Sequence, residues 1–272
     1  MSFAPLKSAT PVLALCASLA AAAPAAAQSP AQNQNTGFYI GGGGAASFVR
    51  DSDNDGVLTG DFTTGAGTTI PVGTVLPSGT DLSWTTEYDT GWGVFGNAGY
   101  RFANQFRVEL ELVYGTNDVD RHLDLVAAGI PLAAEDAGVL VTGSGNLGVT
   151  TADLLADGRG DTSIIAPMVN AYYDFALDGG FTPHVGFGVG YARVASDFRP
   201  SGVEVLDDQD WVFAFQAMAG LAYPIAQNVE LFGGYRYLQT TQPEFDLTLL
   251  PGTLETQYRV HRAELGVRFF LN

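Results

Sequence analysis

The chain is nearly free of cysteine and lysine, and this shortage excludes several classes of protein. Its only cysteine is Cys16 and its only lysine is Lys7. One cysteine cannot form an intramolecular disulfide framework or a zinc site built from several thiolates. Lys and Arg together number 12 against 29 Asp and Glu, and the formal net charge is −17 at pH 7. Nucleic-acid-binding proteins need a basic face, so we expect no nucleic-acid partner.

Long apolar runs are also missing beyond the first 27 residues. A transmembrane helix needs about 20 consecutive apolar residues, so a helical inner-membrane protein is excluded. The sequence also contains no phosphate loop, zinc-ligand spacing or nucleotide fingerprint. It therefore predicts no organic cofactor.

The first 27 residues predict a secretory signal peptide. Lys7 supplies a positive charge, residues 11–23 form a short apolar run, and residues 25–28 read Ala-Ala-Ala-Gln, a small-residue cleavage site. Cleavage there would remove both the cysteine and the lysine. We expect three segments: the signal peptide (1–27), a mobile polar leader (28–36) and one β-barrel domain (37–272).

What the sequence does contain points to β structure. It has 34 Gly, 17 Phe and 11 Tyr, and residues 106–114 alternate strictly in polarity. Phe106, Val108 and Leu110 fall on one face of the predicted strand, while Arg107 and Glu109 fall on the other. Charges on the inner face and large apolar residues on the outer face are typical of a transmembrane barrel.

The alternating segments are joined by short turns and long loops in turn. This pattern predicts an all-β fold, a closed antiparallel transmembrane β-barrel of about eight strands, with short periplasmic turns and long outer loops. The predicted strands are 37–49, 84–103, 105–117, 162–177, 181–196, 209–223, 228–240 and 256–271. Long loops also contain β-like pieces, notably 139–149, which could extend the barrel beyond the membrane or make it ten-stranded.

Charge is distributed unevenly between these segments. The spans 50–90, 117–161, 196–210 and 241–257 hold 23 of the 29 acidic residues, so the predicted outer loops are acidic and the membrane part is nearly neutral. A narrow lumen tolerates charges only when they are paired. We predict a ladder of inward charges, which would either stabilise the barrel or form the constriction of a small channel. Its members are Arg107, Glu109, Glu111, Glu230, Arg236, Arg262, Glu264 and Arg268.

A calcium-like motif stands in the first predicted loop. Asp51, Asp53 and Asp55, followed by Gly56, match the opening half of a D-x-D-x-D-G calcium loop. Phe62 occupies the place of the closing glutamate. The segment is therefore either a calcium site formed by the three aspartates or a solvated acidic loop.

Several segments, taken in order, resemble one family. These are GFYIGGG at 37–43, TGWGVFG at 90–96, GGYRY at 233–237 and ELGVRF at 264–269. Together they resemble the small outer-membrane "porin-family" barrels similar to the membrane domain of outer-membrane protein A, including opacity-type surface proteins. The resemblance implies insertion by the barrel-assembly machinery, which reads a final aromatic residue; here Phe269 or Phe270 would serve.

We expect from these observations a protein of the cell outer membrane that presents acidic loops and serves membrane integrity or surface interaction. Its expected partners are outer-membrane lipid, lipopolysaccharide and unidentified surface ligands. The alternative is a small porin-like channel for ions or small solutes. We do not expect an enzyme, because His122, His184 and His261 show no spacing that pairs them with Ser144, Ser163 or Ser196.

Overall fold

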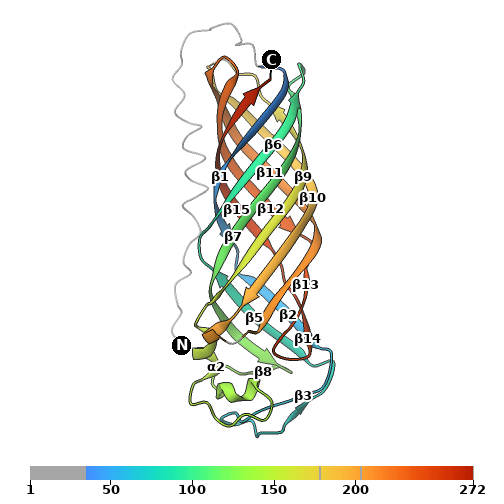
Figure 1. The fold of residues 1–272 in the computed structure, drawn as a ribbon, viewed down its shortest axis with the longest axis vertical. Coiled ribbons are helices and arrows are strands. Elements are labelled where there is room, and N and C mark those ends of the chain that lie inside the picture. Colours follow the sequence, from blue (N-terminus) through green and yellow to red (C-terminus); the bar gives the residue numbers. More distant parts are fainter. Residues whose placement is uncertain (1–34, 178, 203, 272) are drawn as a thin grey trace.

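The computed structural model describes residues 35–177, 179–202 and 204–271. The predicted signal peptide and all but the last two residues of the leader lie outside the described residues. Eight long strands run side by side and form a tilted, elongated barrel (Figure 1). They are β1 (Gly37–Val49), β6 (Gly91–Arg101), β7 (Phe106–Ala127), β9 (Gly160–Asp174), β10 (Thr182–Phe198), β11 (Leu206–Ala226), β12 (Val229–Thr240) and β15 (Arg259–Phe270).

The ring closes through β1, which pairs antiparallel with β6 on one side and with β15 on the other. Every other barrel strand pairs with the barrel strands that precede and follow it in the chain. For β7 the following partner is β9, with which it pairs antiparallel. The result is an up-and-down barrel in which no strand of the ring has a free edge. The predicted fold and strand count are confirmed.

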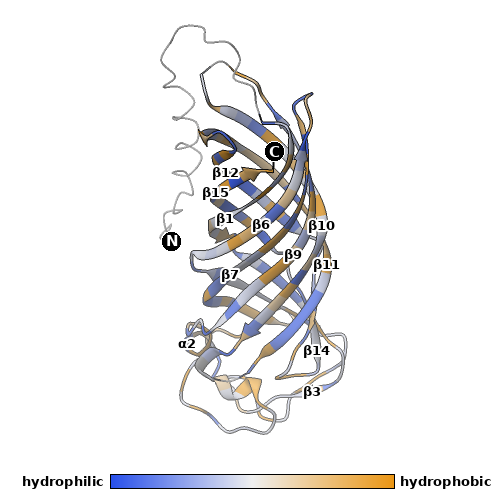
Figure 2. Ribbon diagram, turned by 45° about the horizontal axis from the view of Figure 1, so that its top comes forward, coloured by the Kyte–Doolittle hydropathy of each residue, from blue (hydrophilic) through white to orange (hydrophobic). Residues whose placement is uncertain are grey.

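Side chains alternate between the lumen and the outside, with a polarity opposite to that of a soluble protein. On β7, Val108 and Leu110 are 45% and 64% exposed, whereas Arg107 and Glu109 are each 1% exposed. Apolar and polar positions alternate along the barrel strands in Figure 2. Apolar residues facing outward and charges facing inward are what a hydrocarbon surrounding requires.

Aromatic rings on the outer face form two belts. At the end with the short turns, Tyr100 contacts both Phe38 and Phe102, with ring centroids 4.8 Å apart in each pair. Towards the other end, Trp92 packs against Tyr114 at 5.7 Å. At about 3.3 Å per residue and a tilt of about 40°, the stretch from Trp92 to Tyr100 spans ~20 Å along the barrel axis. Such a spacing fits an apolar band of about 25 Å between interfacial girdles.

Beyond the Trp92 belt, the structure continues as a cap built on the far end of β7. Four further strands extend this end in the order β13–β14–β2–β5–β7, and the small sheet β3–β4 and several short helices complete the cap. The cap contains three short helices in all, one α-helix and two 3-10 helices, and the short strand β8 pairs with β7. The cap elements are β2 (Ser52–Leu58), β3 (Phe62–Thr63), β4 (Val75–Leu76), β5 (Asp81–Tyr88), β8 (Ile130–Pro131), β13 (Glu244–Asp246), β14 (Gly252–Glu255), η1 (Ala137–Leu140), α2 (Thr151–Leu155) and η2 (Pro200–Gly202). No helix among the described residues is long and apolar enough to cross a membrane.

Two details of the prediction need correction. The predicted strand 84–103 is divided at residues 89–90, because β5 pairs with β2 and the extension of β7, whereas β6 joins the ring. The segment 139–149 is not a strand. The carboxylate of Asp136 accepts hydrogen bonds from the backbone N–H groups of Gly138, Leu147 and Gly148, and this holds the segment in a compact loop.

The inward glycines of β1 pack closely against neighbouring strands, and a substitution there tests how narrow the lumen is. A side chain at Gly43 would point inward, and its Cβ would lie 2.2 Å from the Leu265 carbonyl oxygen and 2.8 Å from the Phe95 ring. The Cβ of a residue at Gly44 would meet only the Gly93 carbonyl oxygen, at 3.7 Å. We expect Gly43→Leu to lower the free energy of unfolding by at least about 1–3 kcal/mol, the usual effect of overpacking. Urea titration in lipid vesicles measures it; Gly44→Leu is the matched control, and equal stability of the two variants would contradict the packing described.

Candidate functional site

Among the described residues, ten charged side chains lie in the lumen, five of each sign. They are Arg101, Arg107, Arg236, Arg262, Arg268, Glu109, Glu111, Asp174, Glu230 and Glu264. All eight residues of the predicted ladder are in this set. Arg101 and Asp174 were not predicted, although the signal was present: outward aromatic residues flank each of them along its strand, so the alternation places both inside.

The first group of ion pairs lies at the short-turn end of the barrel. Arg101 contacts Asp174 at 2.8 Å and Glu230 at 2.6 Å. Arg107 contacts the same aspartate at 3.2 Å, and Arg268 contacts the same glutamate at 3.1 Å. Each carboxylate is thus shared by two arginines from different strands. Such sharing joins β6, β7, β9, β12 and β15 across the lumen.

The second group is centred on Arg236, which is 3% exposed. Its guanidinium forms close ion pairs with Glu111 and Glu264. It also donates a hydrogen bond of 2.9 Å to Gln216. Gln216 in turn donates to Glu111 at 3.2 Å and to Asn170 at 2.7 Å. Charges taken out of water are tolerable only with this degree of pairing.

The two groups are connected into one network that fills the lumen. Asn170 donates hydrogen bonds to Glu109 at 3.4 Å and to Glu111 at 3.3 Å, and the Tyr39 hydroxyl donates to Glu109 at 2.8 Å. The cavity between these side chains is about 20 Å³, room for about one water molecule. Within the described part of the chain, Arg262 is the lumen arginine without an ion pair.

The outer cap carries the negative charge. Of its 23 acidic residues, only Glu135 and Asp136 are buried. Both are held by local donors: the Thr69 hydroxyl and amide lower the pKa of Glu135, and the Leu147 and Gly138 amides lower that of Asp136. These two carboxylates therefore stabilise the loops, and the other acidic residues of the cap are at least partly exposed to solvent.

The calcium-like motif lies in and just before an extended strand. Asp53 and Asp55 lie in β2, on its exposed face, opposite Thr85 and Ser83 of β5, and Asp51 precedes the strand. An extended strand points alternate side chains in parallel and does not wrap them around an ion. The described residues contain no group of three or more acidic, histidine or cysteine side chains that could hold a metal. Calcium binding by Asp51, Asp53 and Asp55 stays a prediction.

The histidines are placed apart from the candidate serines. His122 in the cap bonds through Nδ1 to the Thr86 hydroxyl at 2.9 Å, and His261 bonds to the Tyr235 hydroxyl. His184 is buried at the short-turn end, 5.9 Å from the Tyr172 ring. In the part of the chain described, no hydrogen bond connects these histidines to Ser144, Ser163 or Ser196.

A closed ring with an apolar outside, aromatic belts and an ion-paired lumen defines an outer-membrane β-barrel. The chain belongs to the surface antigen family, whose model matches residues 73–270. It is 28% identical over 179 residues to outer membrane protein PagN of Salmonella typhimurium, covering 61% of this chain and 66% of that protein. An uncharacterized protein of Brucella suis is 28% identical over 150 residues, 52% of this chain and 49% of that one. The chain thus spans about half the length of the Brucella relatives.

Two solved structures of outer-membrane or surface proteins align with most of the chain. Neisserial surface protein A covers 86% of this chain and 97% of its own, with a TM-score of 0.44 and 16% identity. Outer membrane protein OprG from Pseudomonas aeruginosa covers 87% of this chain and 97% of its own, with a TM-score of 0.46 and 16% identity.

Removing the central arginine tests the ion-paired lumen. Arg236→Met would leave Glu111 and Glu264 buried without their main partner. Breaking a buried pair in this way destabilises a protein by about 3–5 kcal/mol, and we expect a loss of this order in urea unfolding. The matched control is Arg121→Met, in the cap, because Arg121 is 46% exposed and pairs with Glu87 near solvent; it should leave the unfolding midpoint unchanged. Equal stability of the Arg236 variant and the unaltered protein would refute the role given to this pair.

Proposed function

We propose that this protein is a structural and surface-interaction protein of the outer membrane, which uses its barrel as an anchor and presents the acidic cap to the exterior. The separation of charge supports this proposal most directly. The lumen network is balanced, with five arginines and five acids, whereas 23 of the 29 acidic residues lie in the cap. The barrel interior is neutral without the cap acids, and most of these acids are exposed, so their surplus negative charge is available for interaction outside the cell.

One face of the cap sheet favours a cationic bridge to anionic partners. Glu255 of β14 lies directly opposite Glu244 of β13 on one side and Asp55 of β2 on the other. All three side chains are exposed. Like charges on facing strand positions repel each other, and divalent cations would relieve the repulsion. The same cations would connect this row of carboxylates to the anionic groups of neighbouring lipopolysaccharide.

Retention of lipopolysaccharide by the purified barrel tests the bridge. We expect lipopolysaccharide, counted per barrel in mild detergent with magnesium present, to fall several-fold when EDTA is added. The triple variant Asp55→Asn/Glu244→Gln/Glu255→Gln should show the same fall without EDTA, because it lacks the carboxylate row. Asp81→Asn/Asp89→Asn/Asp124→Asn removes three exposed cap charges outside this row and is the matched control. If neither EDTA nor the triple substitution changes the amount of lipopolysaccharide retained, the cationic bridge is excluded.

The alternative function, a small channel, requires the lumen network to open a path. The packed side chains leave about 20 Å³ at the Arg236 level, too little for a hydrated ion. We therefore expect the refolded protein to be silent in a planar bilayer, with single-channel conductance as the measurement. Steady channels in the unaltered protein that change size in Arg236→Met or Arg262→Met would favour transport and displace the surface role.

We assign no catalytic role to the cap. His122 and His261 bond to the hydroxyl groups of Thr86 and Tyr235. A hydrolytic site would need a histidine oriented by an acid and placed beside a nucleophile.

A further inference from the structure

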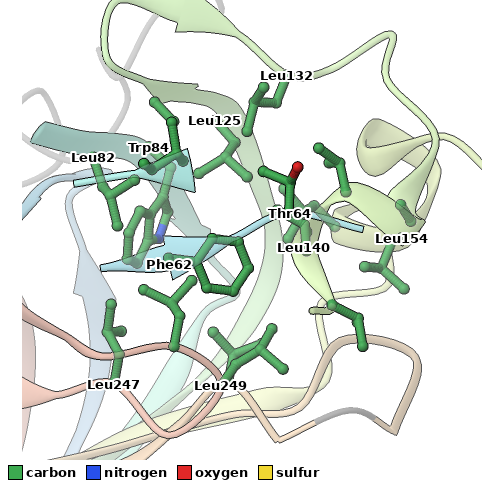
Figure 3. A pocket seen from close by; sticks show the side chains of 18 of the residues that line it. Phe62, Thr64, Leu82, Trp84, Leu125, Leu132, Leu140, Leu154, Leu247 and Leu249 are labelled. Carbon is green, nitrogen blue, oxygen red and sulfur yellow. The ribbon is translucent and has the colours of Figure 1, made fainter. Parts of the chain in front are cut away.

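The cap contains an apolar cavity of about 190 Å³, and all four outer loops contribute to it. Figure 3 shows Phe62 and Leu140 facing into this space, with Trp84 of β5 and Leu249 of the last loop around them. All but three of the lining residues are apolar; the exceptions are Thr64, Thr74 and His122. Protein interiors are normally packed without voids much larger than a water molecule. A cavity of this size is therefore unusual, and a bound molecule would explain why it is not filled by side chains.

Water is a poor occupant of this cavity. A buried water needs two to four polar partners, and empty cavities lined by leucine, isoleucine and phenylalanine stay dry. An engineered cavity of about 150 Å³ with such a lining, in another protein, binds benzene. The cap cavity is slightly larger and lined in the same way. Its size and chemistry fit one hydrocarbon ring or an aliphatic group of similar volume.

His122, one of the three polar residues that line the cavity, has a buried hydrogen-bonding group without a partner. The amide of Asn54 donates to the Thr86 hydroxyl oxygen at 2.8 Å, and that hydroxyl lies 2.9 Å from His122 Nδ1. If the Thr86 hydrogen is donated to Nδ1, the Thr86 hydroxyl both accepts from Asn54 and donates to His122, and the imidazole carries its own proton on Nε2. Burial lowers the pKa of His122 to about 4, so the ring is neutral at pH 7. Nε2 is buried and has no partner among the described residues.

We propose that the cap cavity is a binding site for a small, mainly hydrocarbon molecule of about one ring, with His122 as the donor to a single acceptor oxygen. The location favours a free molecule from outside the cell over a lipid tail. Trp84 and His122 lie on the cap strands, beyond the Trp92 belt that marks the membrane boundary. An acyl chain would have to leave the bilayer to reach them.

A fluorescence titration can observe the site directly, because the chain has three tryptophans and only Trp84 lines the cavity. In the Trp92→Phe/Trp211→Phe background, reconstituted in nanodiscs without detergent, Trp84 is the sole reporter. Bromobenzene is the probe, since its heavy atom quenches a tryptophan that it contacts. We expect saturable quenching at submillimolar free probe. Val139→Phe and, independently, Leu140→Phe should weaken binding at least tenfold by filling the space.

The controls separate binding from nonspecific effects. Val149→Phe makes the same change at a site in the same loop that is 45% exposed and outside the cavity, and it should bind like the parent. Retained barrel mobility in unheated gel electrophoresis shows that each variant is folded. Quenching that rises linearly and equally in all of the variants would overturn the proposal. Quenching by nanodisc lipids brominated in their acyl chains, without a response to free bromobenzene, would overturn the choice of a free ligand.

The role of His122 has its own comparison. Toluene and benzaldehyde are nearly equal in size, and only benzaldehyde carries an acceptor oxygen. We expect benzaldehyde to displace bromobenzene at several-fold lower free concentration than toluene does. In His122→Phe this preference should vanish while bromobenzene still binds. An unchanged preference in that variant would show that the imidazole is not the donor.

Discussion

Every backbone N–H and C=O group in the membrane must find a partner within the protein, because hydrocarbon offers none. The pairing of β1 with both β6 and β15 meets this requirement by removing the last free edges of the sheet. Closure has a second consequence. A ring of eight strands is only just wide enough for its own side chains, so the inward positions must hold groups that fill and neutralise a narrow space.

The lumen solves this problem with shared ion pairs. Arg101 and Arg107 meet at Asp174, and Arg236 lies between Glu111 and Glu264. Arg107 also pairs with Glu109 of its own strand, but the other ion pairs of the lumen join different strands. The network therefore connects the strands across the lumen, while the backbone hydrogen bonds connect them along the barrel wall. Buried pairs of this kind are weak evidence for stability when compared with an apolar core. The outer face of this barrel is already apolar, however. Charged and polar residues at the inward positions therefore give each strand one face suited to the lumen and one face suited to lipid.

The cap follows different rules, because it lies outside the membrane. There β2, β5 and the end of β7 form a sheet with buried apolar residues such as Leu58 and Leu82 on one side and exposed aspartates on the other. The outer face of strand β7 thus lies in lipid along its first half and in water along its second half. Its first half exposes Leu110 and buries Glu111, whereas its second half exposes Asp120 and buries Val119. The change of polarity along one strand marks where the membrane ends and allows a hydrophobic cavity to form within an acidic surface.

The sequence alone determined the barrel, because strict alternation of polarity is a local signal that survives without knowledge of partners. Arg107 and Glu109 were recognisable as inward residues in this way, and the concentration of acids in the long loops needed only counting. Tertiary structure decided which charges meet: Arg101 and Asp174 are separated by 73 positions, and only strand register brings them within 2.8 Å. It also decided that Asp53 and Asp55 lie in an extended strand, since pairing with β5 and β14 overrides a motif that in isolation favours a turn. The cap cavity is formed by four loops that are distant in sequence, so no local sequence pattern predicts it.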